Sequence, residues 1–271
     1  MSQLDFLFGK KFKGGPDFRL NRTYNYDLDG IDLEVTVPDS NIQSASGEAV
    51  SQFPFRRPGW FDEHCQQLSN HFYVTLGAGG SWAYVGPTWK VGKEPLGTLD
   101  LFVWIKRTLL GHTLKQGDMD CLAAAIRSDY EEYFNAEEPG DYGRGKNRQR
   151  LRDAAEKYDK PYMLNDPDMQ RRKQLFIQKG SRELPQKFDV REYGTQRWLH
   201  YTLEREPNYP THHYCQALDE HFYLDIFFHY GLDFRDYFHY WKDHAEAAEQ
   251  RMIQAIRLNF PDRVETDLIQ R

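Results

Sequence analysis

Alternation of apolar and polar positions predicts a first β-hairpin within residues 18–37. The apolar positions of its second half are Ile31, Leu33, Val35 and Val37, and polar residues separate them. This two-residue period is typical of a half-buried strand. The segment Asp27-Leu28-Asp29-Gly30 predicts the turn, because Asp and Gly tolerate a positive φ. A polar loop is expected from Asn41 to Ser51.

Three further stretches in the first half of the chain read as strands, the second of them as either a short strand or an ordered loop. They run over residues 68–76, 82–91 and 99–110. The third is nearly continuous in apolar residues, which is typical of a strand buried on both faces. Gly77-Ala78-Gly79-Gly80 ends the first of them. A phosphate-binding loop is a weaker interpretation of these glycines, because no Lys-Ser or Lys-Thr ending and no helix pattern follow.

The period then changes to that of a helix in two places. Asp118 is a plausible N-cap for a helix that ends near Asn135. Asp233 is predicted to cap a second, longer helix that Pro261 stops. The apolar stripe of that second helix is Phe234, Phe238, Trp241, Ala245, Ala248, Met252 and Ile256. The polar residues expected mainly off the stripe are Lys242, Asp243, Glu246, Glu249 and Arg257.

One segment of the chain occurs twice. Residues 65–76 return as residues 215–226, at an offset of 150 and without a gap. Six of the twelve positions are identical: Cys, Gln, Leu, His, Phe and Tyr. A shared segment at a fixed offset suggests one structural unit used twice. This favours a structural role for the repeated Cys and His residues over a catalytic one.

The segment between the two copies is basic. Residues 141–182 contain twelve Lys or Arg against six Asp or Glu, whereas the whole chain carries a net charge of −6. We interpret this segment as one or two exposed helices. The predicted fold is α+β, with two related units of antiparallel sheet followed by a long helix, joined by a basic helical linker. The expected divisions are residues 1–138, 139–185 and 186–271.

Composition narrows the class of protein. The acidic balance argues against a general nucleic-acid binder, so direct nucleic-acid contact by the basic segment is a minor alternative. Three scattered Cys form neither a disulfide framework nor a zinc motif, which fits a reducing compartment. No signal peptide or membrane-spanning apolar run is recognised, so a cytoplasmic location without membrane contact is expected. No cofactor is expected.

Histidines concentrate in the second half of the chain. Seven of the ten fall between His200 and His244. A metal site is conceivable, but His239 and His244 are five residues apart and do not share a helix face, and no HExxH motif is present. The prediction is therefore no metal and no catalytic residue. An enzyme remains the alternative, with a site assembled in the fold. Its candidate members are His212, His213, His229, Asp225 and Asp236.

Two groups of carboxylates interleaved with tyrosines are the candidate partner-binding residues. The first group, on the predicted hairpin, is Tyr24, Tyr26, Asp27, Asp29, Asp32 and Glu34. The second, at the end of the first helix, is Glu131, Glu132, Glu137 and Glu138. Such groups suit a partner with a basic cleft, because charge complementarity steers association. Solubility is the equally weighted alternative.

Four features of the chain favour a protein that binds another protein. They are its acidic character, its many aromatic residues, the duplicated segment and the absence of a catalytic motif. On this general character of the whole chain, and on no signature motif, the protein resembles bacterial immunity proteins encoded beside toxins of the type VI secretion system. The resemblance implies one-to-one inhibition of a cognate toxin acting in the cytoplasm, with a nuclease as the natural candidate. A structural or adaptor protein of a secretion or phage particle is a third class. A homodimer is left open, because open strand edges can associate.

Overall fold

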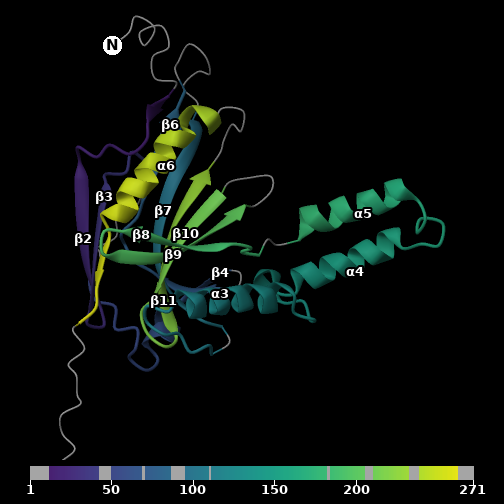
Figure 1. Cartoon of the computed structure of the whole chain (residues 1–271), viewed down its shortest axis with the longest axis horizontal. Coiled ribbons are helices and arrows are strands. Elements are labelled where there is room, and N and C mark those ends of the chain that lie inside the picture. Colours follow the sequence, from purple (N-terminus) through teal and green to yellow (C-terminus); the bar gives the residue numbers. More distant parts are fainter. Residues whose placement is uncertain are drawn as a thin grey trace, which may run out of the picture.

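The computed structural model describes residues 12–42, 50–68, 71–86, 95–109, 111–181, 184–204, 210–231 and 238–261. Within these residues, nine strands form one antiparallel sheet and three more form a small second sheet (Figure 1). The main path of the large sheet runs β1 (Lys13–Gly14), β6 (Gly80–Val85), β7 (Pro95–Arg107), β11 (Phe222–Gly231), β10 (Pro210–Ala217), β9 (Gln196–Glu204) and β8 (Phe188–Tyr193). The two remaining strands, β4 (Gln66–Leu68) and β5 (His71–Thr75), join it through the pairing of β5 with β7.

Strand β7 lies at the centre of the large sheet. Its apolar run contacts both copies of the repeated segment, β5 on one side and β11 on the other. Phe72 and Phe222 both lie opposite Arg107, so the two copies pair with β7 in the same register. Strands of both predicted units therefore belong to one sheet.

The first copy of the repeat is a hairpin and not the single strand predicted over residues 68–76. Strand β4 pairs back onto β5, with Leu68 opposite His71. The alternation of apolar positions does not reveal this reversal. The other two stretches contain strands with shifted ends, although residues 87–91 of the predicted stretch 82–91 lie outside the described residues. Strand β7 begins four residues before the predicted start, and β6 ends at Val85.

The predicted hairpin at residues 18–37 is confirmed as β2 (Asn21–Leu28) and β3 (Ile31–Pro38). Asp29 and Gly30 form the two-residue turn with φ of 56° and 87°. Positive φ at both positions matches the right-handed twist of the flanking strands. Strand β12 (Arg257–Asn259) completes the small sheet by pairing with β3.

The helices of the described segments are α2 (Trp60–His64), α3 (Met119–Phe134), the 3₁₀ turn η1 (Asp141–Gly143), α4 (Lys146–Tyr158), α5 (Pro167–Gly180) and α6 (Phe238–Gln254). The predicted N-cap of α3 is confirmed, because the Asp118 side chain accepts the backbone N–H of Cys121 at 2.9 Å. Helices α4 and α5 occupy the basic segment and project from the large sheet as an antiparallel pair (Figure 1). We call this pair the helical arm.

Side chains on opposite faces of the large sheet enter two main cores, and Tyr73, Trp104 and Phe227 form a smaller third cluster. One core lies between this sheet, α6 and the small sheet, and it contains three fully buried tryptophans, Trp82, Trp198 and Trp241. The other core lies between the opposite face and α3, and it contains Leu122, Ile126 and Tyr201. We refer to these faces as the α6 face and the α3 face.

The predicted stripe of the last helix is confirmed for Trp241, Ala245, Ala248 and Met252. Its expected start at Asp233 and Phe234 lies outside the described residues. The prediction that Glu249 lies off the stripe is wrong, since its exposed fraction is only 2%. Polar side chains of β10 and β11 face this part of α6 and accommodate the carboxylate. No helix in the described part of the chain is long and apolar enough to cross a membrane.

Replacing Trp241 with alanine should destabilise the protein by roughly 3–5 kcal/mol, the usual cost of deleting a large buried aromatic side chain. The Trp241 ring is fully buried and stacks on Tyr84 at 4.5 Å between ring centroids. Urea unfolding of the variant and the wild type measures the difference in the free energy of unfolding. Tyr162→Ala, at a ring that is 73% exposed, is the control and should change it little. A loss below about 1 kcal/mol for Trp241→Ala would contradict the core assignment.

Candidate functional site

The acidic side chains of the hairpin lie on the solvent side of the small sheet. Tyr26, Leu28 and Leu33 enter the core, while the residues that alternate with them stay outside. Asp27 lies directly opposite Asp32 in the β2–β3 register, and both are exposed. Two carboxylates are therefore neighbours on one face, with Asp29 at the turn beside them.

Few internal contacts involve these carboxylates. Asp27 Oδ1 accepts the backbone N–H of Gly30 at 2.6 Å, which supports the turn. Glu34 forms a long ion pair with Arg257, with 3.8 Å between Oε1 and Nε. Tyr26 was predicted as a partner-binding residue, but its exposed fraction is 3%, so it belongs to the core. The ring of Tyr24 is half-buried and stacks parallel to the Tyr26 ring at 6.3 Å.

The second acidic group, Glu131, Glu132, Glu137 and Glu138, is exposed at the end of α3. The helical arm partly neutralises it, because Glu137 lies 3.6 Å from Arg148 and its carbonyl accepts a hydrogen bond from Arg152. Helix α3 and the small sheet pack on opposite faces of the large sheet. The two predicted acidic groups therefore do not form one surface.

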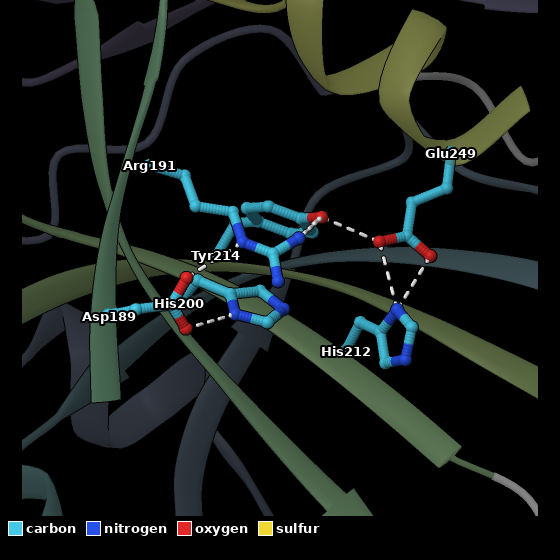
Figure 2. Close-up of polar contacts among 6 residues, drawn as sticks. All are labelled: Asp189, Arg191, His200, His212, Tyr214 and Glu249. Carbon is cyan, nitrogen blue, oxygen red and sulfur yellow. Dashed lines mark hydrogen bonds and ion pairs between the residues drawn. The ribbon is translucent and has the colours of Figure 1, made fainter. Parts of the chain in front are cut away.

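A buried polar network on the α6 face surrounds the Glu249 carboxylate (Figure 2). Glu249 accepts hydrogen bonds from the hydroxyls of Tyr214 and Tyr230, and it contacts His212 Nδ1 at 2.9 and 3.0 Å. Burial favours the protonated acid, but the hydrogen bonds from His212 and the two tyrosines outweigh it and lower the pKa of Glu249. The carboxylate is thus ionised and held by three donors from two strands.

The network continues to β8 at the edge of the sheet. Tyr214 accepts a hydrogen bond from Arg191 Nη1 at 3.3 Å, and Arg191 Nε donates to Asp189 at 2.9 Å. Asp189 also contacts His200 Nδ1 at 2.7 Å, as Figure 2 shows. Burial lowers the pKa of His200, and the contact with Asp189 offsets this only in part. His200 is therefore neutral, with Nδ1 donating to the carboxylate.

A second buried network lies on the α3 face around Asp225. Lys106 Nζ donates to Asp225, His213 Nδ1 lies 3.1 Å from both carboxylate oxygens, and the Cys215 thiol lies 3.4 Å from one of them. Burial opposes ionisation, but the charge of Lys106 and the contact with His213 hold the pKa of Asp225 well below its usual range. The His213 ring is stacked between Tyr201 and Phe227. Burial lowers the pKa of His213, so this imidazole is neutral.

These buried groups have the chemistry of structural contacts. Burial raises the pKa of Cys215 well above its usual value, which keeps it a thiol and a poor nucleophile. The carboxylates of Glu249 and Asp225 each accept several donors, so little hydrogen-bonding capacity remains for a ligand. Both networks connect neighbouring strands across the sheet.

The four described residues of the enzyme alternative do not all converge. His212 and His213 are adjacent on β10 and point to opposite faces. His213 joins Asp225, whereas His229 pairs with Thr211 at 3.2 Å. Asp236 lies outside the described residues. Among the side chains that the structure describes, no group of three or more His, Cys, Asp or Glu residues is arranged to hold a metal ion.

Sequence reasoning missed several members of the buried networks, namely Lys106, Asp189, Arg191, Tyr214, Tyr230 and Glu249. A signal existed for Glu249, because it lies four residues after Ala245 and three before Met252 on the buried stripe of α6. Lys106 ends the apolar run of β7, where its inward position follows from the alternation of the strand. The partners of both charges come from segments distant in the chain, and no local pattern indicates them.

Replacing Lys106 with methionine should cost roughly 3–5 kcal/mol, because the substitution leaves the buried Asp225 charge without its cation. Denaturant unfolding at pH 7.5 measures the loss. The matched control is Lys242→Met on the exposed side of α6, where the ammonium forms a solvent-accessible pair with Glu246. That change should cost under about 1 kcal/mol. Equal losses in the two variants would contradict a special role for the buried pair.

Stability should decrease in mild acid because of His200 and His213. Burial places the folded-state pKa of each below the ordinary 6.5, so below pH 6.5 the unfolded chain binds protons that the folded protein does not. The stabilisation from each buried neutral histidine is complete above pH 6.5 and is lost as the pH falls from there towards the folded-state pKa. For each histidine the loss is at most about 1.4 kcal/mol for each unit of pH. Urea unfolding at pH 7.5 and 5.5 measures this change.

The pH dependence can be assigned with two variants. His200→Gln should reduce the difference between the two pH values, whereas His221→Gln, at an exposed imidazole, should leave it as in the wild type. A free energy of unfolding that is the same at both pH values would contradict the prediction of two buried neutral imidazoles.

Comparison with known proteins does not assign the chain to a family. No family model matches it, and no curated protein matches it significantly. Among solved structures, the extracellular domain of PknH from Mycobacterium tuberculosis aligns over 94% of this chain and 91% of its own length, with 8% identity and a TM-score of 0.18. A similarity at that level carries no argument about fold or function.

Proposed function

We propose that this protein is a non-catalytic binding protein that neutralises a cognate protein toxin by direct contact. The contact surface is the acidic face of the β2–β3 hairpin, formed by Asp27, Asp29, Asp32 and Glu34. The partner has a basic cleft of the kind that binds nucleic-acid phosphates, so a nuclease acting in the cytoplasm is the proposed target. Carboxylates in such a cleft compete with the phosphates of its substrate.

The pairing of Asp27 with Asp32 is the observation that carries this proposal. Like charges directly opposite each other in an antiparallel pair destabilise the strands. Asp27 supports the turn through Gly30, but Asp32 has no such role in the hairpin. A local arrangement that opposes folding is expected where function requires it. A basic partner would convert the repulsion into a favourable interaction.

The hairpin is also a rigid platform for these charges. Leu28, Leu33 and Val35 anchor it in the core shared with α6 and the large sheet. The backbone of Asp27 forms further hydrogen bonds with Ser51 and Phe53, at 2.8 Å each. Carboxylates held in place before association lose little conformational freedom on binding, which favours affinity.

The buried networks support a binding role over an enzymatic one. The histidines and acids of the two buried networks are engaged with each other, in contacts that connect the strands of the large sheet and α6. The acidic residues of the hairpin, in contrast, face solvent. The hairpin surface therefore presents charges to another molecule, whereas the buried networks do not.

The internal organisation is part of the same proposal. We infer that the two repeated segments derive from one duplicated unit, and that the helical arm is the basic linker between the two units. The shared register of Phe72 and Phe222 on β7 supports this history. In this view, duplication provided a wide sheet on which the acidic hairpin is mounted.

Co-expression with the product of the adjacent gene tests the proposal. The wild type should form a stable complex with that product and restore growth. Asp27→Asn, Asp29→Asn, Asp32→Asn and Glu34→Gln, combined in one variant, should weaken the complex by about tenfold or more at low salt, with a smaller effect at high salt. Asn-Gly remains a favourable turn pair at positions 29 and 30, so the fold should be retained.

The matched control removes the same number of charges elsewhere. It combines Asp120→Asn, Glu156→Gln, Asp168→Asn and Asp243→Asn, all at exposed positions outside the hairpin. This control should bind like the wild type. Equal weakening in both variants would show that only net charge matters, and unchanged binding of the hairpin variant would exclude the hairpin as the contact surface.

A further inference from the structure

The large sheet has one long open edge among its described strands. On its main path, β1 at one end has two residues, and the branch strand β4 has three. At the other end, β8 has six residues, Phe188–Tyr193, and pairs only with β9 in the described part of the chain. The edge of the small sheet at β2 is partly covered, because Asp27 forms a parallel bridge with Gln52.

Strand β8 carries only part of the protection that is usual at an edge. Natural edges are blunted by short length, by charged side chains and above all lysine, by inward-pointing charges, by proline, or by a bulge. Three of the six residues of β8 are charged, but Asp189 and Arg191 are engaged with each other and with His200 and Tyr214. Strand β8 contains neither lysine nor proline, and its register with β9 continues without a shift. Val190, in the middle of the strand, is 43% exposed although it is aliphatic. The strand therefore presents free backbone groups beside an exposed apolar side chain.

We propose that β8 pairs antiparallel with β8 of a second copy of this chain, with Val190 opposite Val190 of that copy at the two-fold axis. The two nine-stranded sheets then join into one continuous sheet. A two-fold interface uses the same surface on both chains, so β8 must complement itself.

The sequence of β8 fulfils this requirement. In the register centred on Val190, Asp189 lies opposite Arg191 of the second copy, and Arg191 opposite its Asp189. Opposite charges in directly opposed positions stabilise antiparallel pairs, and apolar pairs such as Val190 with itself do the same. Asp189 and Arg191 already form an ion pair at 2.9 Å within one chain. Dimerisation would extend this pair into a network of four alternating charges.

The strand is also held in a conformation that can accept a partner. Phe188 packs into the core of the α3 face, while Tyr193 packs against the core of the α6 face. Asp189 is fixed by His200, and Arg191 by its contact with Tyr214 (Figure 2). These contacts keep β8 extended, so little ordering is needed when the second copy binds.

Molar mass in solution tests the proposal. The full-length wild type should have the mass of a dimer at micromolar concentration, measured by light scattering after size exclusion. Val190→Lys places like charges opposite each other at the two-fold axis and should yield a monomer. Val50→Lys is the matched control, since Val50 is an exposed valine (61%) remote from β8 in the sequence, and it should remain a dimer.

A mixing experiment tests the register itself. Val190→Glu should be monomeric alone, like Val190→Lys, because the two glutamates repel each other. A one-to-one mixture of the two variants should form a heterodimer, in which lysine lies opposite glutamate. Circular dichroism of each variant checks that the fold is retained, so that loss of the dimer is not a consequence of unfolding.

Each outcome decides for or against the proposal. A monomeric wild type would overturn it and leave the edge available to a strand of another protein. A Val190→Lys variant that remains dimeric would place the dimer interface elsewhere. A mixture that stays monomeric would overturn the pairing centred on Val190.

Discussion

The contact between Lys106 and Asp225 is the interaction on which the large sheet depends. It connects β7 to β11 in the middle of the sheet, and both charges are almost completely buried. Lys106 also lies over the rings of Trp104 and Phe227, whose faces favour a cation. The carboxylate in turn orients His213 on β10. Three central strands are therefore fixed by one ion pair that water does not screen.

The second network has the same role nearer the edge. Glu249 connects α6 to β10 and β11 through His212, Tyr214 and Tyr230, so one carboxylate fixes the helix to the sheet. Both networks consist of polar groups that would be costly if left unpaired in the core. They restrict which strand and which face can pack together, and apolar contacts alone specify this less strictly. Their buried histidines are understood best as parts of the scaffold.

Local patterns in the sequence identified much of the architecture. Alternation at Ile31–Val37 located a strand, and the stripe through Trp241 and Met252 located the last helix, because these periods depend only on which face is buried. The repeat indicated that residues near Phe72 and Phe222 have equivalent places. Pairing between strands that are distant in the chain leaves no such local signal, so their common neighbour β7 could not be predicted. Tyr26 was placed at the surface because an aromatic residue among acids resembles an interface residue.

The helical arm is a part of the chain that is only loosely tied to the large sheet. It leaves the body after α3 and returns at β8, and none of the described side chains of α5 is buried. Its two helices pack mainly on each other, for example through Arg150 and Phe176. The arm can therefore open as a subglobal unit while the sheet stays intact. For the same reason its length and sequence can diverge between related chains without altering the pairing of any strand. We therefore expect the arm to tolerate insertions and substitutions better than the sheet does.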